Sequence, residues 1–158
     1  MRSRRALRLS PWSRWCFWFG RCVPRVVLIR HADVAGGGTD PSLNAAGVAR
    51  AEELRHVLRD AGIQAIFVSG FLRTQQTAAP LAGDLGLAPT AIADPGATVA
   101  AIRNLPSSSA ALVVGHTNTL PDIAVGLGAK SFPTIGATEF DRLFVEDRGR
   151  VTALRYGA

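Results

Sequence analysis

The sequence predicts an α/β protein with three layers, in which a mostly parallel central sheet carries helices on both faces. Two observations support this fold class. Short apolar runs of buried-strand length alternate along the chain with segments of helical periodicity. The 158 residues are 47% apolar and 19% charged, which fits one globular core. We therefore expect one folded domain over residues 25–158.

The first strand and helix are predicted in the first half of this domain. Residues 26–29 (Val-Val-Leu-Ile) form a continuous apolar run, and residues 33–42 form a loop rich in Gly and Asp. Asn44 is a suitable N-cap for a helix that Gly62 ends. The apolar residues that recur at helical spacing, and that we expect to form the buried face, are Val48, Ala51, Leu54, Val57, Leu58 and Ala61.

A second strand and helix follow, over residues 65–68 and 72–85, and Gly86 ends the helix. This alternation of strand and helix favours parallel strands with crossover connections. The rest of the chain predicts, in order, a short strand over 89–93, a helix over 97–105, a strand over 111–115, a helix over 119–127, and a hairpin of 139–146 and 151–154.

The net charge of +6 comes from the N-terminal segment. Residues 1–25 contain seven Arg and no acidic residue, whereas residues 26–158 contain eleven basic and twelve acidic residues. All Trp and Cys residues also lie in this first segment. We expect residues 1–24 to be a basic, Trp- and Arg-rich extension without a fold of its own. Contact of this extension with an anionic membrane or single-stranded nucleic acid is the alternative, but we expect no stable nucleic-acid partner.

Several other classes of protein are excluded. No apolar run approaches the ~18 residues that span a bilayer, so no transmembrane segment is predicted. The apolar stretch 15–20 is short for a secretion signal, so we expect a cytoplasmic protein, with secretion as the alternative. Cys16 and Cys22 alone make neither a disulfide framework nor a zinc site, and no metal is expected.

Four side chains that could bind a ligand or take part in a reaction follow predicted strands. Arg30 and His31 come directly after the first strand, Arg73 begins the helix after the second, and His116 follows the strand over 111–115. Open parallel sheets bind ligands beyond the carboxyl ends of their strands, so these side chains should converge. A helix N-terminus at Arg73 adds backbone amides that favour an anion.

Two arginines and two histidines at one edge suit a phosphoryl group. Planar guanidinium groups bind its oxygens bidentately, while one neutral imidazole attacks phosphorus and the other stabilises the developing charge. Taken singly, each of these residues would be an ordinary structural histidine or surface arginine, so the prediction depends on their convergence. His56, on the polar face of the first helix, is expected to have no role. The glycines at 36–38 lack the Lys and Ser/Thr of a P-loop.

The residues around these four positions resemble the histidine phosphatase superfamily, also called phosphoglycerate-mutase-like. The resemblance covers the chain from about residue 25 to its end. The segments that carry it are Val27-Leu-Ile-Arg-His-Ala-Asp33, Leu43-Asn-Ala-Ala-Gly47, Val68-Ser-Gly-Phe-Leu-Arg-Thr-Gln-Gln-Thr-Ala78, Leu112-Val-Val-Gly-His-Thr-Asn-Thr-Leu120 and Glu139-Phe-Asp-Arg-Leu-Phe-Val145.

The resemblance implies a role for each of the four residues. His31 would be the nucleophile that forms a phosphohistidine, Arg30 and Arg73 would hold the phosphoryl oxygens, and His116 would complete the pocket and stabilise the transition state. Asn118 is a further candidate for substrate binding. No metal or organic cofactor is implied.

The sequence also departs from the family pattern. Ala32 stands where the family has Gly, and His116-Thr-Asn118 lacks the Asp that donates a proton in acid phosphatases and phytases. The segment 86–110 is short, and its only carboxylate is Asp94, which argues against a mutase. These features resemble the small phosphohistidine or general phosphatase branch. Asp33 could replace the missing proton donor, with a surface salt bridge as the alternative role.

The sequence therefore predicts a cofactor-independent phosphohydrolase that acts through a phosphohistidine on a small phosphate ester or phosphohistidine. Its partner would be a small phosphorylated substrate or a phosphoprotein. The alternative is a catalytically weak module of the same fold that binds a phosphorylated ligand.

Overall fold

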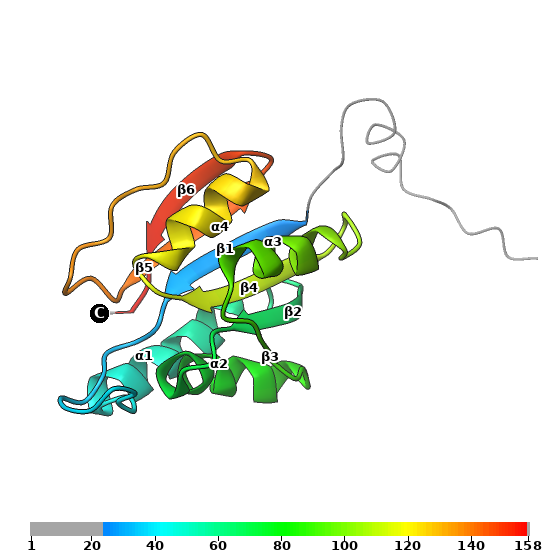
Figure 1. The fold of residues 1–158 in the computed structure, drawn as a ribbon. Helices are drawn as coiled ribbons and strands as arrows, with labels where there is room; N and C mark the ends of the chain where they lie inside the picture. The colour runs from blue at the N-terminus through cyan, green and yellow to red at the C-terminus, as the bar shows by residue number, and fades with distance from the viewer. Residues whose placement is uncertain (1–23, 158) are drawn as a thin grey trace, which may run out of the picture.

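The central sheet of the protein has six strands in the order β3-β2-β4-β1-β5-β6 (Figure 1). The structure is a computed structural model that describes residues 24–157, so apart from Pro24 the predicted N-terminal extension lies outside the described residues. β1 to β4 are parallel, whereas β5 and β6 are antiparallel additions at one side. The strands are β1 (Arg25–Arg30), β2 (Ile63–Val68), β3 (Thr90–Ala91), β4 (Ala110–Gly115), β5 (Arg142–Asp147) and β6 (Arg150–Arg155).

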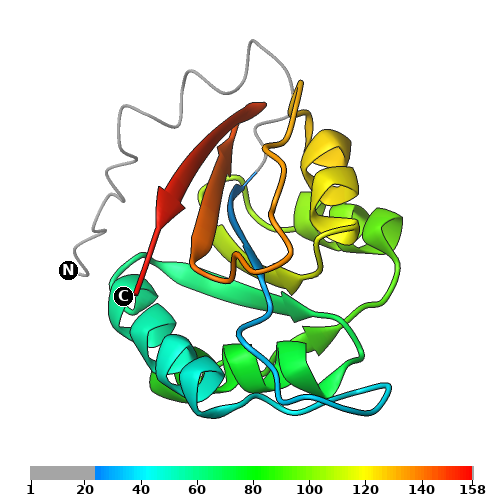
Figure 2. The same ribbon diagram turned by 90° about the vertical axis from the view of Figure 1, so that its left-hand side faces the viewer.

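Helices cover both faces of this sheet, which confirms the three-layer α/β prediction. The helices are α1 (Ala45–Leu58), α2 (Leu72–Leu85), α3 (Pro95–Arg103) and α4 (Thr119–Leu127). Figures 1 and 2 show α1 and α2 on one face of the sheet and α3 and α4 on the other. Val27 and Ile29 of β1 pack in the cluster that includes residues of α1 and α2, while Val26 and Leu28 pack with residues of α3 and α4. Both faces of β1 are therefore buried, as its continuous apolar run predicted.

The helix ends follow the local signals that the sequence carries. Asn44 Oδ1 accepts a hydrogen bond from Gly47 N at 2.8 Å, so Asn44 caps α1. Gly86 ends α2 with a φ of 65°, in the left-handed region that glycine adopts readily. The first helix, however, ends at Leu58, and Gly62 lies in the turn that leads to β2.

The predicted buried face of α1 was wrong in part. Val48 and Val57 are 55% and 48% exposed, and Ala61 is exposed after the helix. The buried residues are instead Gly47, Ala51, Leu54 and Leu58. Gly47 lies against the backbone of Asp33, where a Cβ would overlap the Asp33 carbonyl oxygen. Because of this close approach, the helix face formed by residues 47, 51, 54 and 58 is the face that packs toward the sheet.

The structure confirms the predicted hairpin. Its first strand, predicted over 139–146, begins and ends later, at Arg142 and Asp147. Its turn places Arg148 and Gly149 at φ values of 53° and 81°, the left-handed conformation of a two-residue hairpin turn. Residues 139–141 precede β5 and belong to the loop after α4. Among residues 24–157, no helix has the length and apolar character needed to cross a bilayer.

Candidate active site

His31 and His116 lie side by side at the carboxyl edge of the sheet. β1 and β4 are neighbours, and their last residues, Arg30 and Gly115, are paired. The residues that follow, His31 and His116, therefore lie next to each other at the edge of the sheet. His31 N donates to Gly115 O at 3.0 Å, and the two imidazole centroids are 5.3 Å apart with an interplanar angle of 60°. Strand order thus brings together two histidines that are far apart in sequence.

The ring of His31 is held in one orientation. The side chain is only 7% exposed, and its Nδ1 lies 2.8 Å from Ala32 O. Because a carbonyl oxygen only accepts, Nδ1 carries the proton, and Nε2 keeps its lone pair. Ala32 is itself fully buried, and its amide donates to Thr77 Oγ1 at 2.9 Å. The neutral tautomer of His31 is therefore the one that a nucleophile at Nε2 requires.

Arg30 is fixed between a loop and an aromatic ring. Its Nη1 donates to the carbonyls of Gly136 and Ala137 at 3.1 and 2.8 Å, and its guanidinium lies 4.1 Å from the centroid of the Phe140 ring. Arg30 Nε is buried and has no hydrogen-bond partner among the described residues. The contacts of the described residues therefore leave one donor of this guanidinium unpaired.

Arg73 lies in the first turn of α2 and is stacked in a similar way. Its guanidinium lies 4.2 Å from the centroid of the Phe71 ring, and Nη1 contacts Asp40 Oδ1 at 3.3 Å. Both oxygens of Asp40 also accept from Leu72 N, at 3.0 and 2.9 Å. The expected anion at this helix N-terminus is thus supplied by the chain itself, and Asp40 orients Arg73.

The electrostatics of the site favour neutral imidazoles. Burial is the main cause that lowers the pKa of His31, and the charges of Arg30 and Arg73 lower it further. Burial, followed by the charges of Arg73, His31 and Arg30, lowers the pKa of His116 to about 4. Two fixed positive charges beside two neutral rings make a site that attracts an anion.

His116 is bound by residues that sequence reasoning missed. Its Nε2 lies 2.9 Å from Ser69 Oγ, and Ser69 Oγ lies 2.9 Å from Thr74 Oγ1. The ring of Phe71 also packs against His116, perpendicular to the imidazole ring at a centroid distance of 5.3 Å. The signal for Ser69 was its place directly after β2, the same place that marked His31 and His116.

The other residues considered in the sequence analysis are exposed or are bound by neighbouring groups. Asn118 is exposed at the N-cap of α4 and makes no side-chain cap hydrogen bond. Asp33 Oδ2 pairs with Arg50 Nε at 2.7 Å. His56 is exposed on α1. Asp94 caps α3, since its Oδ2 accepts from Ala97 N at 2.6 Å.

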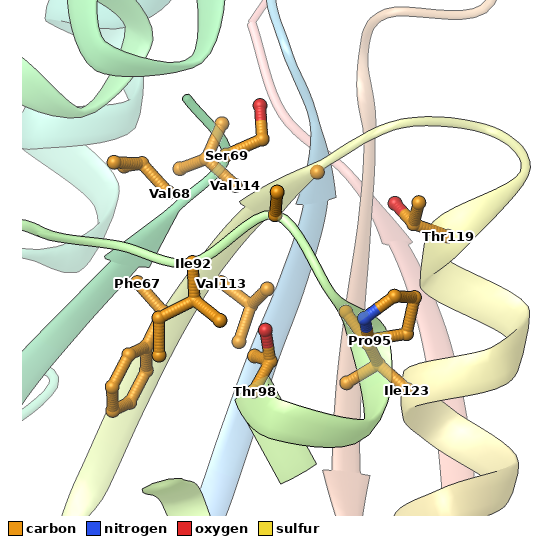
Figure 3. Close-up of a pocket in the computed structure, with 12 residues that line it drawn as sticks. Phe67, Val68, Ser69, Ile92, Pro95, Thr98, Val113, Val114, Thr119 and Ile123 are labelled. Carbon is orange, nitrogen blue, oxygen red and sulfur yellow. The ribbon is translucent and has the colours of Figure 1, made fainter. Parts of the chain in front are cut away.

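A small cavity adjoins the site without being large enough to hold a substrate. It has a volume of about 20 Å³, room for about one water molecule. Figure 3 shows that apolar side chains such as Phe67, Ile92 and Ile123 line it, with Ser69 and Thr119 at its border. This cavity is too small to hold a phosphoryl group. Within residues 24–157, no three His, Cys, Asp or Glu side chains gather in a way that could hold a metal ion.

Comparison with solved structures shows the same fold. The protein histidine phosphatase SixA in complex with tungstate superposes with a TM-score of 0.65 at 19% identity, covering 85% of this chain and 96% of that chain. SixA from Agrobacterium tumefaciens gives a TM-score of 0.61 at 23% identity, with 85% and 97% covered. A mycobacterial glucosyl-3-phosphoglycerate phosphatase in complex with inorganic phosphate gives 0.59 at 16% identity, with 85% and 96% covered.

The sequence itself matches a family over the segment that carries three of the four converging residues. Residues 26–95 match the histidine phosphatase superfamily (branch 1), and this segment includes Arg30, His31 and Arg73. No curated protein sequence matches the chain significantly. The chain therefore has the histidine phosphatase fold, and its segment 26–95 carries the sequence pattern of branch 1 of that superfamily.

Proposed function

We propose that this protein is a cofactor-independent phosphohydrolase that forms a phosphohistidine at His31. The observation that carries the proposal is the bond from His31 Nδ1–H to Ala32 O at 2.8 Å, which leaves Nε2 unprotonated beside Arg30, Arg73 and His116. A nucleophilic imidazole needs a free lone pair, and a phosphoryl acceptor site needs positive charge. Both conditions are met at one edge of the sheet.

The two guanidinium groups are suited to the phosphoryl oxygens. Arg30 retains its buried Nε donor, and Arg73 stands in the first turn of α2. Two solved structures of this fold support the same ligand chemistry, because one was obtained with tungstate and another with inorganic phosphate, both tetrahedral oxyanions. We infer that Arg30 and Arg73 bind the phosphoryl group and that Asn118 approaches the rest of the substrate.

The reaction proceeds in two displacements. His31 Nε2 attacks phosphorus, the bond from phosphorus to the leaving atom breaks, and the leaving group departs with that electron pair. Water then attacks the phosphorus of phospho-His31, the P–N bond breaks, its electron pair returns to Nε2, and phosphate is released. Arg30 and Arg73 stabilise the charge on the phosphoryl oxygens in both steps.

The leaving group decides which substrates react fastest. An alkoxide needs a proton as it departs, and general acid catalysis contributes typically ~10²–10⁴-fold. The carboxylates whose charges act on His31 and His116 are Asp33 and Asp40, and each contacts an arginine. We infer that phosphohistidine or an aryl phosphate reacts faster than a sugar phosphate.

The proposal is tested by assaying the purified chain on phosphohistidine, an aryl phosphate and a sugar phosphate. His31→Ala should abolish turnover, while the matched control His56→Ala, on the exposed face of α1, should leave it unchanged. Quenching during turnover should trap an acid-labile, base-stable phosphoprotein in the wild type and none in His31→Ala. Near-normal activity of His31→Ala would overturn the mechanism. Phosphate binding without turnover in the wild type would indicate a binding module instead.

A further inference from the structure

A short chain of hydroxyl groups connects α2 to the ring of His116. Thr74 Oγ1 contacts two carbonyl oxygens, that of Phe71 at 2.8 Å and that of Ser69 at 3.0 Å. It also lies 2.9 Å from Ser69 Oγ, which in turn lies 2.9 Å from His116 Nε2. Thr74 is fully buried, so water does not compete for the bonds of its own hydroxyl group.

The direction of each hydrogen bond in this chain follows from the number of protons. A carbonyl oxygen only accepts, so the single hydroxyl proton of Thr74 goes to one of the two carbonyls. Thr74 Oγ1 must then accept from Ser69 Oγ. Ser69 has given its only proton to Thr74, so its oxygen can bond to His116 only by accepting from Nε2–H. This assignment leaves one oxygen contact of Thr74 without a proton, the one to the second carbonyl, whereas every assignment in which Ser69 donates to His116 leaves two.

We propose that Thr74 and Ser69 are positioning residues that fix His116 in the Nε2–H tautomer, so that its Nδ1 is the ring nitrogen left to exchange a proton with the substrate. No described residue donates to or accepts from His116 Nδ1 through a hydrogen bond. The paired histidines thus hold opposite tautomers, with the proton on Nδ1 in His31 and on Nε2 in His116.

The consequence for catalysis rests on the proposed phosphohydrolase function. A neutral ring that carries its proton on Nε2 accepts a proton at Nδ1. During hydrolysis of phospho-His31, the attacking water forms its bond to phosphorus, passes a proton to His116 Nδ1, and the P–N electron pair returns to His31 Nε2. His116 would then be the base of the second displacement.

The tautomer can be measured without any turnover. In the full-length protein labelled with ¹⁵N-histidine, long-range ¹H–¹⁵N spectra distinguish a protonated from an unprotonated ring nitrogen. The chain has three histidines, and His116→Asn assigns the signal. We expect Nε2–H for His116 in the wild type. In Thr74→Val, which keeps the shape but removes the hydroxyl, Ser69 is free to donate its proton to Nε2, so the tautomer should change to Nδ1–H.

Thr74→Ser is the matched control, because it restores the hydroxyl and should restore the Nε2–H tautomer. If valine disturbs the packing, which a lowered melting temperature of Thr74→Val would show, Thr74→Ala provides the same test. An unchanged His116 tautomer in folded Thr74→Val or Thr74→Ala overturns the proposal, as does Nδ1–H in the wild type. These outcomes are independent of whether the protein hydrolyses any phosphate.

Kinetics then test the catalytic consequence. Loss of one oriented hydrogen bond is worth about 1 kcal/mol, so Thr74→Val should slow hydrolysis of the phosphoenzyme by roughly five- to tenfold, and Thr74→Ser should recover the rate. Formation of phospho-His31 should change less. An equal loss in both steps would contradict a role for His116 as the base of the second displacement.

Discussion

Asp33 lies two residues after His31, yet its carboxylate is bound to Arg50 of α1, with Oδ2 and Nε 2.7 Å apart. Both side chains are largely buried, at 22% and 15% exposure, and the backbone of Asp33 packs against Gly47 on the same helix. The carboxylate closest in sequence to His31 is therefore part of the contact between the loop and α1.

Asp33→Asn tests whether this carboxylate also donates a proton. The ion pair leads us to expect a loss of about 1 kcal/mol in the free energy of unfolding and an equal, small loss of kcat/KM on all substrates. The measurement compares an aryl phosphate with an alkyl phosphate in both proteins. A loss confined to the alkyl ester, which needs the proton more, would instead identify Asp33 as the donor.

Arg73→Lys should be costly although it keeps the charge. An ammonium group provides neither the planar face that stacks on Phe71 nor the forked donors that contact Asp40 and that the proposed mechanism assigns to a phosphoryl oxygen. We expect kcat/KM to fall roughly 10- to 100-fold, as when a charged hydrogen bond of ~1.5–3 kcal/mol is lost. Arg59→Lys, at the exposed end of α1, is the matched control. Equal activity in both variants would argue against bidentate binding by Arg73.

Stability should fall as the solution is acidified from about pH 6.5 to pH 4. In this range the unfolded chain protonates His116 with a pKa near 6.5, whereas burial keeps the folded ring neutral down to about pH 4. The unfolded state then binds more protons, so the free energy of unfolding decreases with decreasing pH. His31 contributes in the same direction, because its pKa is lowered as well.

Thermal melts across this pH range provide the measurement. His116→Asn should flatten the dependence, while His56→Asn, on the exposed face of α1, should not. A dependence as steep in His116→Asn as in the wild type would show that His116 is not its source.

Gly47→Ala should destabilise the protein, because the added Cβ would overlap the carbonyl oxygen of Asp33. That backbone lies two residues from His31, so we expect a loss of ~1–3 kcal/mol in unfolding free energy together with reduced turnover. Gly83→Ala on α2 is the control, because a Cβ there meets nothing within 4 Å. The control should be neutral or stabilising, since alanine restricts the unfolded chain more than glycine does. Similar melting temperatures for both variants would contradict the close approach.

Deletion of residues 1–23 should leave the fold and turnover intact. β1 begins at Arg25, whose amide donates to Ser109 O at 3.2 Å, so the deletion keeps all the strands that the structure describes. Any binding to anionic vesicles or nucleic acid should be lost, because the excess of arginine lies in this segment, and before deletion it should weaken with added salt. A large drop in melting temperature would show that the extension packs on the domain.

The sequence alone determined the features that depend on neighbours along the chain. The bounds of α2 and α4 agree with the prediction, because helical periodicity and the terminating Gly86 are local signals. Continuous apolar runs likewise identified β1 and β4, and the residue after each of them was recognised as a site candidate. The parallel-sheet rule then sufficed to predict that His31 and His116 meet.

The tertiary structure decided the features that depend on contacts between distant segments. Arg30 bonds to carbonyls more than a hundred residues away, and Ser69 reaches His116 only because β2 and β4 are adjacent. The choice between Gly47 and Val48 for the buried face of α1 likewise depended on the path of the 33–42 loop. Periodicity indicates which residues share a face, but strand order and backbone approach decide what that face touches.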